Sequence, residues 1–148
     1  MGRKKIALAS DHAGFRLKEH LLRYLISEGY EVKDYGCYSE ESVDYPDFGH
    51  ILAQSVAGGA YPAGISLCGS GNGINMTVNK HQGIRSALCW NEETSRLARA
   101  HNDANICSLP ARFISEAEAF LIVKTFLDTD FDGGRHKVRI DKIPLKLI

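Results

Sequence analysis

The feature that most constrains the fold is the alternation of short apolar runs with segments of helical period. Runs with the length of strands lie at 6–10, 31–35, 64–68, 84–89 and about 105–109. Parallel strands need crossovers of this kind, and each connecting helix must cover one face of the sheet. The sequence therefore predicts an α/β fold with a single doubly wound, Rossmann-like sheet of five parallel strands and helices on both faces.

The predicted helices carry recognisable end signals. Pro46 suits the first turn of the second helix, and Gly58 and Gly59 end it. Asn91 is a predicted N-cap, and Ser115 with Glu118 has the pattern of a capping box. The first helix is predicted to be amphipathic, with its apolar face formed by Leu17, Leu21, Tyr24 and Leu25 and its polar face by Arg16, Lys18, Glu19 and Arg23.

Length and charge exclude several classes of protein. The 148 residues suit a single domain, 1–148, and 18 basic residues balance 18 acidic ones. A net charge of zero provides no general attraction to nucleic acid or anionic lipid, so neither is an expected partner. The apolar stretch at 6–9 is shorter than a signal peptide needs, and no run reaches the ~18 residues of a membrane span. We therefore expect a cytoplasmic protein without a membrane partner.

The four cysteines are widely spaced and form no C-x-x-C pair. They are Cys37, Cys68, Cys89 and Cys107. This spacing disfavours a zinc site or a disulfide framework, so we expect free thiols and no bound metal.

The tail, about 133–148, is predicted to be irregular and basic. It has no obvious face to cover within one copy of the chain. We therefore expect it to pack on a partner subunit.

The segment Cys68–Gly73 places a thiol at a strand end, followed by alternating glycines. Small residues let backbone N–H groups converge on an anion. A dinucleotide site is disfavoured because the spacing here is G-x-G-x-G and the segment follows the third strand. Cys68 has two readings: an inert core thiol, or a reactive one whose thiolate the neighbouring N–H donors stabilise.

Other polar residues also have a structural and a functional reading. Asp11 and His12 follow the first strand, where Asp11 could simply cap a helix or could face a ligand at the carboxyl edge of the sheet. His101 near a helix C-terminus could only complement the helix dipole. The basic residues Arg112, Arg135, His136 and Arg139 could form a solvated face or bind phosphate. Taken together, a thiol, an acid–base pair, an oxyanion cradle and arginines suggest enolisation of a small phosphorylated sugar.

Ordered motifs along nearly the whole chain resemble those of the ribose-5-phosphate isomerase B family, which also holds galactose-6-phosphate isomerase subunits. The motifs are Asp11-His12-Ala13-Gly14, Asp44-Tyr45-Pro46, Cys68-Gly69-Ser70-Gly71-Asn72-Gly73, Asn79-Lys80, Gly83-Ile84-Arg85, His101-Asn102-Asp103-Ala104-Asn105 and Gly133-Gly134-Arg135-His136. One departure is Ser108-Leu109-Pro110-Ala111, which replaces the more usual glycine-rich approach to Arg112.

The resemblance implies a role for each matching residue. Cys68 corresponds to the base that moves the proton between C2 and C1, since Ile74 stands where other members carry a glutamate base. Ser70 keeps the hydroxyl of the threonine found in many members. The backbone of 69–73, including Gly69, Gly71, Asn72 and Gly73, would hold the enediolate oxygens. His101, helped by Asp11 and Tyr45, would open the sugar ring. Phosphate would lie on His12, Arg112, Arg135 and Arg139, and Asn102 would contact sugar hydroxyls.

The implied activity is interconversion of D-ribose 5-phosphate and D-ribulose 5-phosphate, in the non-oxidative pentose phosphate pathway, without a cofactor or metal. The implied assembly is a homodimer with shared active sites, with a tetramer as a further option. Two alternatives stay open. One is a hexose-6-phosphate isomerase acting on galactose or allose 6-phosphate. The other is a non-catalytic flavodoxin-like module that binds a nucleotide phosphate on the glycine-rich loop.

Overall fold

The sheet of the protein has five parallel strands. The computed structural model describes residues 4–147. The strands lie in the order β2-β1-β3-β5-β4 and are β1 (Lys5–Ser10), β2 (Glu31–Asp34), β3 (Gly64–Cys68), β4 (Ser86–Leu88) and β5 (Ile106–Pro110). The predicted five-stranded parallel sheet is confirmed.

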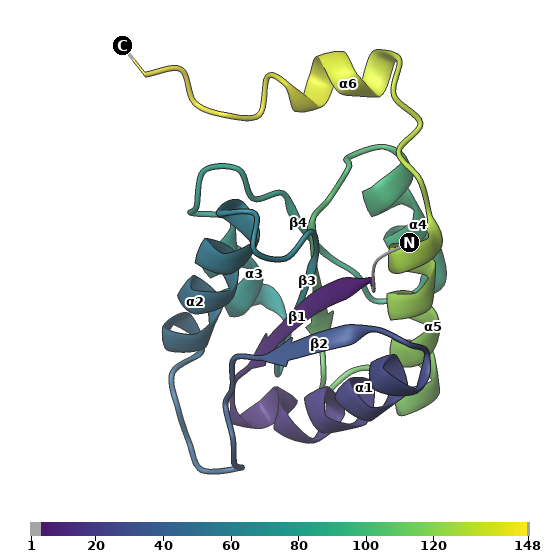
Figure 1. Ribbon diagram of the computed structural model, residues 1–148. Coiled ribbons are helices and arrows are strands. Elements are labelled where there is room, and N and C mark those ends of the chain that lie inside the picture. Colours follow the sequence, from purple (N-terminus) through teal and green to yellow (C-terminus); the bar gives the residue numbers. More distant parts are fainter. Residues whose placement is uncertain (1–3, 148) are drawn as a thin grey trace.

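Helices cover both faces of the sheet (Figure 1). One face carries α1 (Phe15–Ser27), α4 (Glu92–Ala100) and α5 (Glu116–Asp128), and the other carries α2 (Tyr45–Ala57) and α3 (Asn72–Val78). A short 3-10 turn, η1 (His12–Gly14), joins β1 to α1, and a last helix, α6 (Arg135–Ile140), stands apart from both layers. The doubly wound arrangement is confirmed as well.

The core follows from the two-residue period of the strands. In β1, Ile6 and Leu8 pack against α1 and α5, whereas Ala7 and Ala9 face α2 on the other side of the sheet. All four side chains are fully buried. A strand that is buried on both faces has a continuous run of apolar residues, and this pattern at 6–10 predicted the strand from the sequence.

The strand order puts the topological switch point, where open α/β sheets form a ligand-binding crevice, at the carboxyl ends of β1 and β3. These strands are neighbours, but the helix that follows β1 lies on one face of the sheet and the helix that follows β3 lies on the other. The connections diverge there and leave room for a ligand. The segments after Ser10 and Cys68 therefore face the same space.

Several predicted element ends are displaced. β4 is shorter than predicted, because the Arg85 N–H donates to the Asn105 side chain (2.9 Å) rather than to a neighbouring strand. β5 ends one residue later, at Pro110. The prediction that the tail is irregular is wrong for Arg135–Ile140, which forms α6.

The predicted helix caps are present. The Asn91 side chain accepts the Thr94 N–H (2.8 Å), and Ser115 Oγ accepts the Glu118 N–H (3.1 Å). The Glu118 carboxylate accepts the Ser115 hydroxyl (3.0 Å), so this carboxylate supports the cap through the side chain of Ser115. Within residues 4–147, no helix has the length and apolar character required to cross a membrane.

Lys18 contradicts the prediction that it lies on the exposed face of the first helix. Its side chain is fully buried, and its Nζ lies 2.8 Å from both carboxylate oxygens of Asp34 and 3.0 Å from Glu19. Asp34 also accepts the Gly36 N–H (2.9 Å), and Gly36 in turn accepts the Ser10 N–H (2.7 Å). The buried ion pair therefore ties α1 to the loop that leads from β2 towards α2.

We expect Lys18→Ala to lower the free energy of unfolding by about 3 kcal/mol, because removing one partner leaves the Asp34 carboxylate without its cation. Arg16→Ala is the matched control. Arg16 lies on the same helix as Lys18 and pairs with Glu40 of the loop after β2, but both side chains of this pair are largely exposed, so loss of Arg16 should cost at most about 1 kcal/mol. Urea unfolding of both variants tests this expectation, and equal midpoints would contradict it.

Candidate active site

Cys68 ends β3 and opens the glycine-rich loop. Cys68 is 4% exposed. Three residues further along the loop, Gly71 has a φ of 79°, which lies in the left-handed region. A Cβ on Gly71 would lie 2.5 Å from Leu88 Cδ1, so only glycine fits this turn. The backbone then enters α3, whose first N–H groups have no partner within the helix. This loop can therefore present N–H donors to an anion next to the thiol.

Tyr45 lies directly on this loop. It is the first residue of α2, and a Cβ added to Gly73 would lie 2.4 Å from Tyr45 Cζ. The ring is 38% exposed. A phenol is therefore held against the glycine-rich loop with part of its surface open to a ligand.

Arg112 lies at the other end of the same loop. Its N–H donates to the Gly69 carbonyl and the Ala111 N–H donates to the Cys68 carbonyl, both at 3.0 Å. A Cβ added to Gly69 would lie 3.0 Å from Arg112 Nη1, so the guanidinium rests on this glycine. The segment Ser108-Leu109-Pro110-Ala111, which differs from the family's usual glycine-rich motif, lies mostly in strand β5, with Pro110 in register with Cys68. Arg112 follows this segment and still reaches the glycine-rich loop.

Asp11 and His12 border the crevice from β1. The Asp11 N–H donates to the Leu67 carbonyl (3.2 Å), and its carboxylate, which is buried, accepts the Gly14 N–H (3.2 Å). Asp11 therefore caps the 3-10 turn η1, which was one of its two readings. His12 accepts the Val43 N–H at Nδ1 (3.1 Å), which ties it to the loop before α2.

His101, Asn102, Arg135 and Arg139 lie elsewhere in the chain. His101 is the C-cap of α4, which runs from the carboxyl end of β4 back to the amino end of β5, so it lies at the edge of the sheet opposite Cys68. Figure 1 shows the end of α4 and α6 at the top, away from the start of α1. Arg85 Nε donates to the carbonyl of Asn102 (2.9 Å), and this hydrogen bond holds Asn102 at the same edge.

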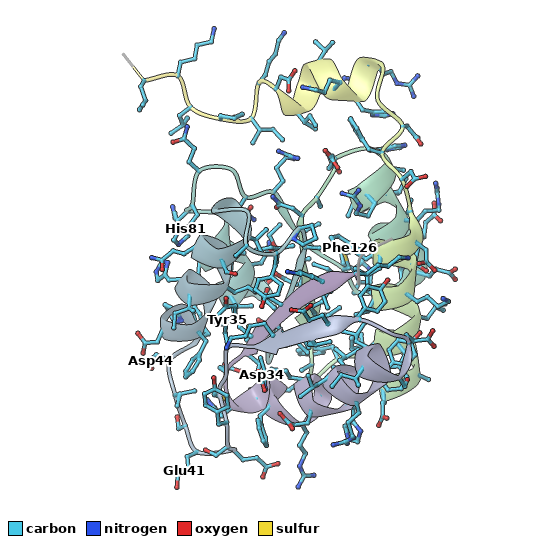
Figure 2. The ribbon with its side chains drawn as sticks, viewed as in Figure 1. Asp34, Tyr35, Glu41, Asp44, His81 and Phe126 are labelled. Carbon is cyan, nitrogen blue, oxygen red and sulfur yellow. The ribbon has the colours of Figure 1, made fainter. Side chains whose placement is uncertain are left out.

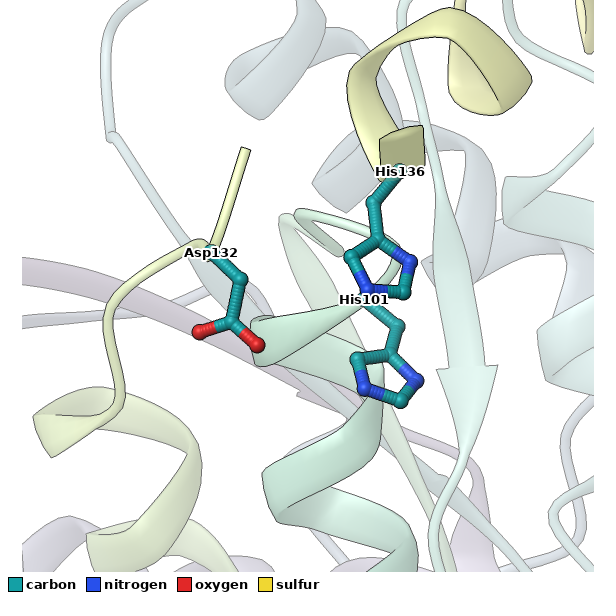
Figure 3. A group of neighbouring side chains, drawn as sticks. All are labelled: His101, Asp132 and His136. Atoms are coloured by element: carbon teal, nitrogen blue, oxygen red, sulfur yellow. The ribbon is translucent and has the colours of Figure 1, made fainter. Parts of the chain in front are cut away.

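The sequence suggests His136 only as part of a solvated basic face or a phosphate site, and it does not identify Asp132. The His101 and His136 rings stack with centroids 4.1 Å apart and planes 12° apart. Figure 3 shows the Asp132 carboxylate beside them. Burial lowers the pKa of His136, and the charges of His101, Arg135 and Arg139 lower it further. Asp132 and His101 are 31 positions apart, so the sequence has no local signal for their contact.

A cavity beside the tail lies away from Cys68. This cavity of about 280 Å³ lies between residues 79–85 and the tail, and its lining includes Ile84, Ile143 and Leu145. Figure 2 places His81 on this side of the molecule. The tail reaches away from the body of the domain, so its position determines the size of this cavity. None of the residues of the glycine-rich loop lines the cavity.

The chain thus carries two separate groups of predicted site residues. One group lies at the carboxyl edge of the sheet and contains Asp11, His12, Tyr45, the loop 68–73 and Arg112. The other lies at the amino edge and contains His101, Asn102, Arg135 and Arg139. Each group holds part of the chemistry that the sequence predicted, and one chain does not bring the two together.

Comparison with known proteins identifies the family of the chain. The model of the family described as ribose/galactose isomerase matches residues 6–143. The chain belongs to the ribose/galactose isomerase family. The resemblance seen in the motifs is therefore confirmed.

Relatives match this ribose/galactose isomerase family member over nearly its whole length, and those of known structure share its fold. The ribose-5-phosphate isomerase B of Escherichia coli is 40% identical over 140 residues, which are 95% of this chain and 94% of the relative. A ribose 5-phosphate isomerase of Thermotoga maritima superposes with a TM-score of 0.94 at 54% identity, covering 96% and 98% of the two chains. The enzyme of Mycoplasma genitalium, solved with bound ribulose-5-phosphate, has a TM-score of 0.90 at 41% identity and covers 94% and 93%.

Proposed function

We propose that the chain interconverts D-ribose 5-phosphate and D-ribulose 5-phosphate as an aldose–ketose isomerase. The observation that carries the proposal is the seating of Arg112 on Gly69, one residue after the Cys68 thiol. A base and a phosphate-binding cation thus flank the same backbone loop. Family membership and near-complete coverage of relatives that bear this name support the same activity.

Cys68 acts as the base in this proposal. Its thiolate takes the C2 proton of the open-chain aldose, and the electron pair of that C–H bond forms the C1=C2 double bond of a cis-enediolate. As this double bond forms, the C1=O electron pair moves onto the C1 oxygen. The thiol then returns the proton to C1, the proton of the C2 hydroxyl passes to the negatively charged C1 oxygen, and C2 becomes the carbonyl carbon. No electron is gained or lost overall, so the step needs no redox cofactor.

The loop stabilises the intermediate. A C2–H bond beside an aldehyde is weakly acidic, and a base alone contributes about 10²- to 10⁴-fold. Each well-placed oxyanion donor adds about 2.7 to 4 kcal/mol. Backbone N–H groups of 69–73 are such donors next to the thiol. The Asn72 N–H donates to the exposed Ser70 Oγ (3.2 Å) in this chain, and the Ser70 hydroxyl adds a further contact for the enediolate oxygens. Small glycines are needed here because the loop must approach the substrate closely.

The remaining steps need residues from both edges of the sheet. His101 donates the proton that opens the furanose ring, with Asp11 and Tyr45 beside the ring oxygen. The sugar hydroxyls contact Asn102. The phosphate is bound by His12, Arg112, Arg135 and Arg139.

A complete site therefore forms between two copies of the chain. One copy contributes the Cys68 edge, and the second contributes the His101 edge together with α6. The exposed tail supports this arrangement, since Leu145 and Leu147 are 90% and 92% exposed in one copy. An isologous two-fold dimer makes two equal sites of this kind, and pairing of dimers into a tetramer would leave them intact.

The substrate is tested with a coupled isomerase assay on a panel of 5- and 6-phosphate sugars. We expect the highest kcat/KM with ribose 5-phosphate. A higher value with galactose or allose 6-phosphate would assign the chain to the hexose phosphates. Absence of ketose product from every sugar would favour the phosphate-binding module instead.

We also expect activity to be independent of metal. Because backbone donors hold the enediolate, dialysis against a chelator should leave kcat and KM for ribose 5-phosphate unchanged. Loss of activity that a divalent ion restores would contradict this oxyanion cradle. The control is the undialysed enzyme assayed in the same chelator.

A further inference from the structure

We propose that His101, Asp132 and His136 form a binding site for a divalent transition-metal ion of the zinc type, and that occupation of this site inhibits the enzyme. The ligand atoms of these three side chains all lie within 4.8 Å of one another. Figure 3 shows the two imidazole rings stacked and the Asp132 carboxylate beside them, and these residues come from the end of α4, the first turn of α6 and the linker before α6. The inhibitory effect rests on the proposed function, whereas the metal binding does not.

The donor set suits zinc. Two imidazoles and one carboxylate are common zinc ligands, and three protein ligands leave a fourth position for water. Tetrahedral zinc with bonds of about 2.0 to 2.1 Å needs ligand atoms roughly 3.4 Å apart. The stacked imidazole rings, whose planes are 12° apart, must therefore rotate so that one nitrogen of each ring points at the ion, and the Asp132 carboxylate must move closer to them. A hard ion such as magnesium prefers oxygen ligands and is not expected here.

The backbone already holds the three residues together. The Asp132 N–H donates to the carbonyl of Ala100, next to His101 (2.9 Å). Arg99 Nε donates to the Thr129 carbonyl (3.3 Å), and the His136 N–H donates to the Gly133 carbonyl (3.1 Å). Ligand positions fixed in this way lower the entropy cost of binding the ion.

The charge balance also permits a cation. Asp132 contributes a negative charge to the cluster, which favours a cation there. Arg135 and Arg139 face the same region and oppose the cation, which limits the affinity. A bound phosphate would neutralise these two arginines. Zinc and substrate compete for His101, because zinc binds an imidazole nitrogen that the substrate needs as a proton donor.

Inhibition follows from the use of His101. An imidazole nitrogen bound to zinc cannot donate the proton that opens the sugar ring. Loss of a general acid costs about 10²-fold or more, so saturating zinc should lower kcat/KM by at least that factor. Chelator should restore the activity fully.

The test measures binding and inhibition separately, in a buffer free of phosphate. Isothermal titration with Zn²⁺ alone and the visible absorption of added Co²⁺ report binding to the native dimer. We expect one ion per chain, and a Co²⁺ spectrum of tetrahedral intensity. Asp132→Asn and His136→Gln should each weaken Zn²⁺ binding at least 10-fold and raise the inhibitory zinc concentration by the same factor, relative to each variant's own metal-free activity.

His81→Gln is the matched control. His81 Nε2 lies 2.7 Å from His50 Nδ1, but within residues 4–147 this pair belongs to no cluster of three possible metal ligands. Its loss should change neither binding nor inhibition. Zinc binding that disappears in His81→Gln, or persists in both Asp132→Asn and His136→Gln, would overturn the site. Binding at the site without loss of isomerase activity would overturn the inhibition only, and an inactive enzyme that still binds zinc would point to the proposed function as the error.

Discussion

Replacing Cys68 with alanine is expected to lower kcat for ribose 5-phosphate by about 10²- to 10⁴-fold, because the C2 proton then has no positioned base. Cys68→Ser should be similarly impaired, since a serine hydroxyl is a far weaker base than a thiolate. Both variants should still bind the sugar phosphate, because Arg112 and the backbone loop are unchanged. The measurements are steady-state kinetics and calorimetric titration with ribose 5-phosphate.

The control for this experiment is Cys107→Ala. Cys107 is also a buried thiol, but it lies in the middle of β5 within the core, where burial raises its pKa well above the usual value of a thiol. Its removal should leave kcat close to that of the native enzyme. A Cys68→Ala enzyme that keeps most of its turnover would exclude the thiol as the base, provided that its circular dichroism shows an intact fold.

Mixing inactive Cys68→Ala and His101→Ala chains is expected to restore about one quarter of native activity. In a heterodimer, one of the two sites receives an intact Cys68 from one chain and an intact His101 from the other, and the second site lacks both. Random exchange makes about half of all dimers heterodimers, so about one quarter of all sites become functional.

The same mixture distinguishes the two possible arrangements. If Cys68 and His101 acted within one chain, every site would keep one defect and no activity would return. Exchange is verified by mass spectrometry on chains of different isotope content. Mixed dimers that form but stay inactive would rule out the shared site, and with it the proposed role of α6. A mixture of Cys68→Ala with Cys68→Ser is the negative control.

Much of the fold could be predicted from local patterns. The continuous apolar runs identified buried parallel strands, and Asn91 and Ser115 marked helix starts through their side-chain chemistry. Short-range signals of this kind place element ends only to within a few residues. The beginning of β4 shows the limit, because Arg85 is taken out of the strand by the side chain of Asn105, which is 20 positions away.

Lys18 shows a different limit. Its position in the helical pattern predicted exposure, yet Asp34 and Glu19 provide enough charge and hydrogen bonding to hold it in a buried position. A lysine is buried only when such partners are present. Whether they are present depends on the packing of α1 beside β2, which periodicity alone does not describe.

The sequence by itself determined the fold class, the family and the composition of the glycine-rich loop, because all three depend on residue types at short spacing. Only the tertiary structure decided which distant residues meet. It brought Tyr45 and Arg112 onto the loop next to Cys68, and it placed His101 with Asp132 and His136 at the opposite edge. The physical reason is the sheet order β2-β1-β3-β5-β4, since strand pairing and helix direction set which edge each residue reaches, and neither is encoded in the spacing between residues.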